Sequence, residues 1–312
     1  MKIVVIGYSK MFAAIVEAVL LSGHELVGVM RHDRVKYNPF RLFIKDKLNP
    51  SNDISFIKSK KLYEIKERSV NSEGFRKEIL KLNPDIIFVC SWSEKIKKEV
   101  FQLPKIGMIN VHPSLLPKYR GPNPYAQVLF NDEKYTGVTF HLVDEGYDSG
   151  GILIQQEFKI LESDDGMSLR NKAASLASIM CKKFLEHVES GVIEPDAQNE
   201  DEASYQGALT LKDAILDLNQ PSNLIIKRIK GLYPWAKAYL DCGKRFLTVK
   251  KYKIEENTTD ANPGSIVAKS GRNISIATID NKIITFIDTK LVKTFFSPST
   301  RLFIKYGLGG KI

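Results

Sequence analysis

The sequence predicts an α/β protein in which a Rossmann-like parallel sheet domain is followed by a small, β-rich, OB-like barrel. Short apolar runs at residues 2–6, 26–30 and 85–90 alternate with segments of helical spacing, which is typical of parallel α/β units. Nearer the C-terminus, short strand-like runs are separated by Gly, Asn and Asp, as in small barrels. The 312 residues are 43% apolar and 26% charged, which suits two globular domains.

The first domain, expected over residues 1–190, has a regular order of elements. Its strands are apolar runs or show period-two alternation, and its helices repeat apolar residues every three to four positions. Pro84 ends the second helix. Between the second strand and that helix, residues 31–61 form an irregular, basic stretch. Strands are expected at 2–6, 26–30, 85–90, 107–111, 137–143 and 152–155, and helices at 12–20, 73–82, 125–130 and 167–188.

A polar, acidic linker is expected at residues 191–205, and a second domain at 206–312. The second domain begins with a short helix and continues as strands bounded by turn residues. The helix is expected at 224–229 and the strands at 246–254, 265–268, 274–278 and 283–287.

One strand end concentrates polar side chains. Asn110 and His112 are two residues apart on the strand at 107–111 and its exit, so both point to the same face of the sheet. Pro113 and Pro117 then force the chain into a stiff loop, since proline removes a backbone donor and fixes φ. Open α/β sheets bind their ligands at such strand ends. A second loop, the glycine-rich acidic turn at 144–151, follows the strand at 137–143.

These segments resemble one enzyme family. Asn110-Val111-His112, Ser114-Leu115-Leu116-Pro117, Arg120-Gly121 and the turn from Asp144 to Gly150 occur in the order and spacing of enzymes that transfer a formyl group from 10-formyltetrahydrofolate. Two later segments, 229–235 and 262–266, resemble the C-terminal domain of the same family. The resemblance implies a formyl transfer reaction that uses 10-formyltetrahydrofolate as the donor and a primary amine as the acceptor.

The resemblance also implies roles for particular residues. Formyl transfer needs an unprotonated amine, donors for the oxyanion and an acceptor for the amine proton. Asn110 offers a neutral N–H donor, His112 can exchange a proton, and Asp148 can hold the imidazole and raise its pKa. Catalysis is thus expected from Asn110, His112 and Asp148, folate contacts from Trp92, Ser114, Leu115, Leu116, Pro117 and Asp144, and acceptor contacts from Lys118 and Arg120.

Two acceptors fit the resemblance, methionyl-tRNA and an amino sugar linked to a nucleotide. The net charge of +10 and the basic residues within 31–61, Arg31, Arg34, Lys36 and Arg41 among them, favour methionyl-tRNA. The first turn and the proline residues Pro113 and Pro122 depart from the tRNA branch and leave the amino sugar open. Hydrolysis of the folate and folate binding without turnover are further alternatives.

Other classes of protein are disfavoured. The turn at 7–12 lacks two of the glycines that a nicotinamide site needs, and no cysteine–histidine spacing suggests a metal. The three cysteines are expected to be buried free thiols. No apolar stretch has the length of a signal or a membrane span, so a cytoplasmic protein is expected. We also expect a cis peptide at Leu116–Pro117, inside the stiff loop.

Overall fold

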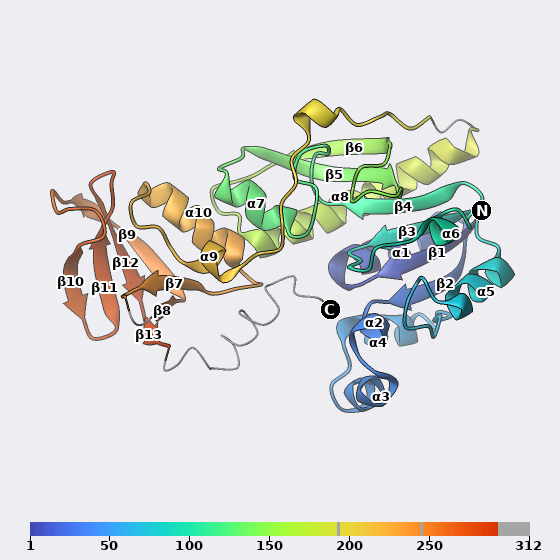
Figure 1. The fold of residues 1–312 in the computed structure, drawn as a ribbon, viewed down its shortest axis with the longest axis horizontal. Coiled ribbons are helices and arrows are strands. Elements are labelled where there is room, and N and C mark those ends of the chain that lie inside the picture. Colours follow the sequence, from blue (N-terminus) through green and yellow to red (C-terminus); the bar gives the residue numbers. More distant parts are fainter. Residues whose placement is uncertain (192–193, 244–245, 293–312) are drawn as a thin grey trace.

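The computed structural model describes residues 1–191, 194–243 and 246–292. Its largest sheet has the strand order β2-β1-β3-β4-β5-β6 (Figure 1). The first four strands along the chain pair in parallel, whereas β5 and β6 are antiparallel additions at one edge. The strands are β1 Lys2–Gly7, β2 Glu25–Arg31, β3 Ile86–Cys90, β4 Gly107–His112, β5 Tyr135–Leu142 and β6 Ile152–Lys159. The predicted Rossmann-like core is confirmed, with a mixed rather than fully parallel sheet.

Both faces of the parallel strands are buried, which explains their continuous apolar sequences. Alternate residues of β1 and β3 pack on opposite sides: Val5 and Phe88 lie in one core cluster, whereas Val4 and Val89 lie in another. The first cluster is covered by α1 Ser9–Leu21, α7 Pro124–Phe130 and α8 Gly166–Glu189, and the second by α5 Glu73–Leu82 and α6 Lys98–Phe101. The predicted helices at 12–20, 73–82, 125–130 and 167–188 are therefore confirmed.

Residues 31–61 are not irregular. They form three short helices, α2 Asp33–Lys36, α3 Pro39–Leu48 and α4 Asn52–Ser59. Asn38 and Ser51 cap α3 and α4 by accepting hydrogen bonds from backbone N–H groups one turn on. In Figure 1, α3 extends away from the sheet. The expectation of an irregular stretch was wrong because capped helices of this length carry weak periodicity.

Two of the arginines expected to contact RNA are engaged within this insertion. Arg31 is only 1% exposed, and its guanidinium donates to Glu64 at 2.7 Å and to Asp46. Arg34 donates to both carboxylate oxygens of Glu64 at 2.6 Å. These cations neutralise partly buried carboxylates, so neither is free to bind an anionic partner. Lys36 and Arg41 remain exposed.

The C-terminal unit is β-rich, as predicted. It contains α9 Leu211–Ala214 and α10 Ser222–Leu232, followed by two antiparallel sheets with strand orders β10-β11-β12-β9 and β13-β8-β7. The strands are β7 Ala238–Asp241, β8 Phe246–Val249, β9 Lys251–Thr258, β10 Ile266–Ser270, β11 Asn273–Ala277, β12 Lys282–Ile287 and β13 Lys290–Leu291. Part of the predicted second domain, residues 244–245 and 293–312, lies outside the described residues, as do residues 192–193 of the predicted linker.

The two units pack through α7 and α10. The Tyr125 ring stacks on the Trp235 ring at 5.8 Å, and Gly231 lies so close to Phe130 that a Cβ at this glycine would come within 2.8 Å of that ring. Lys227, which is nearly buried, pairs with Asp132 across the same contact.

Cys90 and Cys181 are buried free thiols, as predicted, but Cys242 is exposed. Among the described helices, none is both long enough and apolar enough to cross a membrane.

Candidate active site

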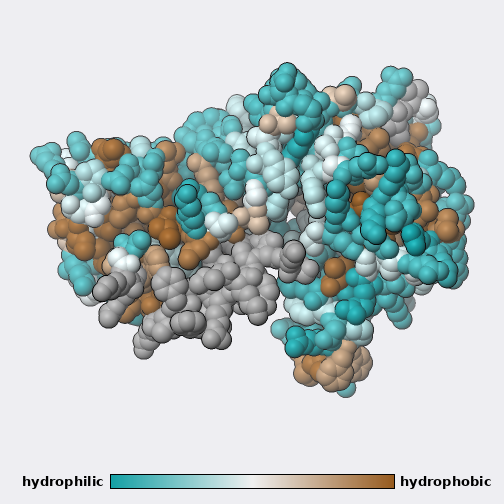
Figure 2. Space-filling model, in the orientation of Figure 1, coloured by the Kyte–Doolittle hydropathy of each residue, from teal (hydrophilic) through white to brown (hydrophobic). Residues whose placement is uncertain are grey.

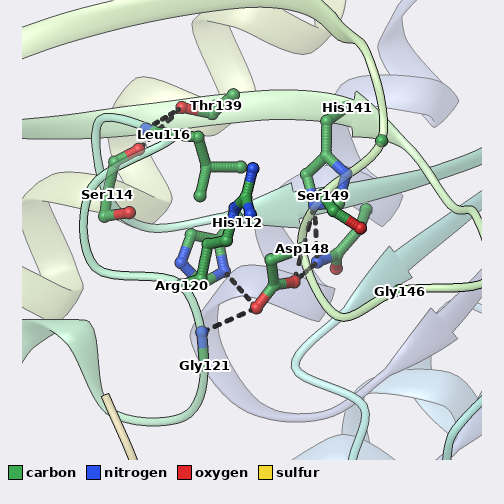
Figure 3. Close-up of polar contacts among 12 residues, drawn as sticks. His112, Ser114, Leu116, Arg120, Gly121, Thr139, His141, Gly146, Asp148 and Ser149 are labelled. Carbon is green, nitrogen blue, oxygen red and sulfur yellow. Dashed lines mark hydrogen bonds and ion pairs between the residues drawn. The ribbon is translucent and has the colours of Figure 1, made fainter. Parts of the chain in front are cut away.

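The site begins with the pairing of β4 and β5. The antiparallel register places Asn110 opposite His141 and His112 opposite Thr139. Because residues two apart share a face, the predicted placement of Asn110 and His112 on one face is confirmed by their common partner, Asp148. His141 joins them from the neighbouring strand (Figure 3).

Asp148 reaches this face from the acidic turn. Its own φ is 54°, a left-handed conformation that Asp tolerates better than most residues. Asp144 organises the turn by accepting bonds from the Gly146 N–H and the Ser149 hydroxyl, both at 2.9 Å. Gly150 must be glycine, since a Cβ there would lie 1.9 Å from the Leu142 carbonyl oxygen. The turn therefore fixes the direction of the Asp148 carboxylate.

The Asp148 carboxylate is held by four groups. Oδ1 accepts a hydrogen bond from Asn110 Nδ2 at 2.9 Å and lies 3.5 Å from His141 Nε2. Oδ2 accepts from the Gly121 backbone N–H at 2.9 Å and lies 3.6 Å from His112 Nδ1. Burial alone would raise the pKa of Asp148, but the two imidazoles and the Gly121 N–H hold it well below its usual range. The carboxylate is therefore ionised at neutral pH.

His112 is buried, and its tautomer follows from its contacts. Nε2 lies 3.0 Å from the Tyr119 carbonyl oxygen, an acceptor, so Nε2 carries the proton and Nδ1 faces Asp148 with a lone pair. Burial lowers the pKa of His112, and the nearby carboxylate raises it only in part. The sequence-based expectation that Asp148 raises this pKa describes one contribution correctly, but burial outweighs it. His112 is therefore a neutral base beside an anion.

The loop after His112 braces the sheet. The Leu116–Pro117 peptide is cis, as predicted. Ser114 is fully buried and donates to the Lys118 carbonyl at 2.8 Å, and the Leu116 N–H donates to Thr139 Oγ1 at 3.3 Å. The Ser114 and Leu116 side chains thus support the loop from inside. Contact of this loop with the folate stays a prediction. Leu115 and Pro117 are partly exposed.

Arg120 was expected to bind an anionic acceptor, but its guanidinium has hydrogen-bond partners within the chain. Its guanidinium is nearly buried and donates to Glu200 at 2.7 Å and to Gln198 at 2.8 Å. Lys118, in contrast, is exposed and remains a candidate contact. The pairing could not be read from the local sequence, because Glu200 lies 80 residues away from Arg120. Acceptor binding by Arg120 stays a prediction.

The segment predicted as a linker takes part in the site. Gln198 donates to the carbonyl oxygens of Asp148 at 2.9 Å and Gly150 at 2.8 Å, while its own carbonyl accepts from Arg120. The segment includes the short 3-10 helix Glu200–Glu202. Sequence reasoning missed Gln198 and also His141, although period-two alternation from Thr139 could have drawn attention to His141.

Aromatic residues line the ends of β2 and β3. The His32 ring lies between the Tyr8 ring at 5.3 Å and the Trp92 ring at 5.2 Å, and its Nε2 is 2.7 Å from the Ser93 hydroxyl. The indole N–H of Trp92 is buried and has no hydrogen-bond partner within the described part of the chain. A buried, unpaired donor is costly, so this group marks a place where a ligand acceptor would be stabilised.

Burial of His32, with a smaller contribution from Lys36, lowers its pKa to about 4. Since an unfolded histidine titrates near 6.5, the unfolded state binds more protons between pH 4 and 6.5, and stability falls as the pH falls. We expect the free energy of unfolding of His32→Gln to fall by up to about 3 kcal/mol less than that of the wild type when the pH is lowered. Urea unfolding of wild type and variant at pH 7 and pH 4.5 measures it, with the exposed His187→Gln as the control. Equal losses in wild type and His32→Gln would contradict the expectation.

Comparison with known proteins agrees with this geometry. Residues 1–185 match the family described as formyl transferase, and residues 208–292 match the formyl transferase C-terminal domain. The chain belongs to the formyl transferase family. The predicted family and enzyme class are confirmed: the protein is a folate-dependent formyltransferase.

Two similar curated proteins are named methionyl-tRNA formyltransferase. The methionyl-tRNA formyltransferase of Clostridioides difficile is 29% identical over 286 residues, which cover 91% of this chain and 90% of that protein. That of Caldanaerobacter subterraneus is 33% identical over 224 residues, 72% of each chain.

Solved structures share the fold at lower identity. An N-formyltransferase from Helicobacter canadensis, bound to folinic acid and dTDP-3-aminofucose, has a TM-score of 0.69 and 19% identity over 92% of this chain and 98% of its own. The sugar 3N-formyl transferase WlaRD has a TM-score of 0.67 and 18% identity over 94% and 98%.

Proposed function

We propose that this formyltransferase transfers the formyl group of 10-formyltetrahydrofolate to the amine of methionyl-tRNA, with Asn110, His112 and Asp148 as its catalytic residues. The choice of acceptor is supported by the similarity to a methionyl-tRNA formyltransferase, which extends along nearly the whole of both chains and includes the C-terminal unit. The two solved structures described above resemble the chain at only 18–19% identity. A nucleotide-linked amino sugar is the second candidate.

The donor side of the site suits a planar heterocycle. A pocket of about 450 Å³ is lined by Phe101, Met108, Leu142 and Val143, among others. Trp92, whose indole N–H is unpaired among the described residues, packs against the apolar cluster that contains Met108 of this pocket. Val143 leads directly into the turn that carries Asp144 and Asp148. We infer that the pterin ring binds in this pocket, with its formyl-bearing end towards His112.

His112 and Asp148 then handle the proton. As the amine nitrogen bonds to the formyl carbon, the carbonyl electron pair moves to oxygen, and His112 Nδ1 takes the amine proton. The ionised Asp148, 3.6 Å away, stabilises the resulting imidazolium. When the carbon–nitrogen bond to the folate breaks, His112 returns this proton to the folate nitrogen. Proton transfer by a positioned base typically contributes about 10²–10⁴-fold in rate.

We infer that helix α3 contacts the tRNA acceptor. Phe40, Phe43 and Leu48 on this helix are 73%, 66% and 77% exposed. Figure 2 shows an apolar tip at the place where Figure 1 draws α3. Arg41 and Lys47 are exposed on the same helix. Cations beside exposed aromatic rings suit the phosphates and bases of RNA. The amino sugar has no need of such an extended surface.

A panel of acceptors tests the proposal. Purified protein with 10-formyltetrahydrofolate is expected to formylate methionyl-tRNA and to release tetrahydrofolate only when that acceptor is present. A panel of nucleotide-linked amino sugars is expected to give no product. Turnover of an amino sugar without turnover of methionyl-tRNA would establish the second candidate, and release of tetrahydrofolate without any acceptor would indicate a hydrolase.

A further inference from the structure

The amide group of Asn110 has both of its hydrogens engaged. Nδ2 lies 3.1 Å from His141 Nε2 and 2.9 Å from Asp148 Oδ1. A carboxamide nitrogen carries two hydrogens, so these two acceptors use both. The sequence-based expectation that Asn110 donates to the oxyanion therefore does not fit the geometry, because no N–H remains for a ligand.

The orientation of this amide is fixed by its neighbours. His141 Nδ1 lies 2.8 Å from the Leu142 carbonyl oxygen, which only accepts, so Nδ1 carries the proton and Nε2 offers a lone pair. Asp148 is an ionised carboxylate and also only accepts. Rotating the Asn110 amide by half a turn would set its oxygen against two acceptors at about hydrogen-bond distance, which is repulsive. Nδ2 must therefore face His141 and Asp148.

The carbonyl oxygen of Asn110 is what remains for a ligand. Within residues 1–191, 194–243 and 246–292, Asn110 Oδ1 makes no hydrogen bond and is not among the fully buried, unpaired polar atoms. We propose that His141 is a positioning residue that holds Asn110 with this oxygen towards the acceptor, where it accepts a hydrogen bond from the attacking amine. The proposal rests on the proposed function, since it assigns the amine to this site.

This arrangement suits a primary amine. The amine has two hydrogens and one lone pair: one N–H is directed to Asn110 Oδ1, the other to His112 Nδ1, and the lone pair is left for the formyl carbon. An amide oxygen is a neutral acceptor that orients the amine without taking its proton. The proton leaves only through His112. Asn110 therefore stays neutral and keeps its hydrogen bonds to His141 and Asp148 throughout the reaction.

Two substitutions at His141 separate its two hydrogen bonds. His141→Gln keeps an acceptor near the position of Nε2, whereas His141→Asn keeps only a donor near that of Nδ1. We expect His141→Asn to lower kcat for formyl transfer about ten- to hundredfold, because the hydrogen bond that orients the Asn110 amide is lost. His141→Gln is expected to stay within about threefold of wild type. Binding of non-reactive 5-formyltetrahydrofolate should be unchanged in both.

NMR gives a readout that needs no turnover. Nitrogen-15 shifts of the imidazole are expected to report an Nδ1–H tautomer for His141. The side-chain N–H signals of Asn110 should exchange slowly with water in wild type and His141→Gln, and quickly in His141→Asn. An Nε2–H tautomer, or equal exchange and equal kcat in the two variants, would overturn the proposal. If wild type formylated no acceptor, the proposed function would fail, and the NMR result would still decide the orientation of Asn110.

Discussion

Asp148→Asn is expected to lower kcat for formyl transfer by about 10²-fold or more, the scale of a positioned acid–base group. The substitution removes the negative charge that stabilises the His112 imidazolium and places a donor or a neutral oxygen where Asn110 and Gly121 now donate. His112→Ala removes the base itself and should cost a similar factor. Single-turnover formylation at saturating 10-formyltetrahydrofolate measures both.

The charge change needs its own control. Asp201→Asn removes one exposed carboxylate from the segment between the two units and should leave kcat unchanged. Because His112 and Asp148 act on one proton, the double variant should lose little more than the worse single variant. Additive losses would mean that the two residues act independently. Wild-type turnover in both single variants would remove them from the mechanism.

The sequence predicted the part of the site that depends on local geometry. Asn110 and His112 share a face because strand side chains alternate, and the prolines after them made a stiff loop inevitable. Asp148 could be added only through the resemblance, since nothing local relates its turn to β4. His141 was missed because its contact with Asn110 depends on the antiparallel pairing of β4 with β5, which is set by strand order.

Charged residues were harder to assign for the same reason. Arg31, Arg34 and Arg120 looked like ligand contacts because exposed arginine is the common case. Each instead pairs with carboxylates that are distant in the sequence, Glu64 and Glu200 among them. Composition gives the sign and amount of charge, but burial decides which cations are free, and burial depends on the folded chain.

Reversal of two exposed cations on α3, Arg41→Glu with Lys47→Glu, is expected to abolish measurable formylation of methionyl-tRNA while leaving folate binding intact. Arg31 and Arg34 stay unchanged in this variant, because reversing them would leave Glu64 and Asp46 unpaired and unfold the insertion. The matched control, Lys182→Glu with Lys183→Glu, makes the same change in net charge on exposed positions of α8.

The salt dependence of methionyl-tRNA binding is a second measurement for this test. If α3 and its surroundings contact six or more phosphates, binding of methionyl-tRNA should weaken about 10³-fold or more between about 50 and 200 mM salt, by analogy with duplex DNA. A nucleotide sugar, with two phosphates, would show a much shallower slope. The α3 variant should also have a shallower slope than the α8 control, because it has lost two cationic contacts. Equal slopes and equal turnover in the two variants would exclude α3 from the acceptor surface.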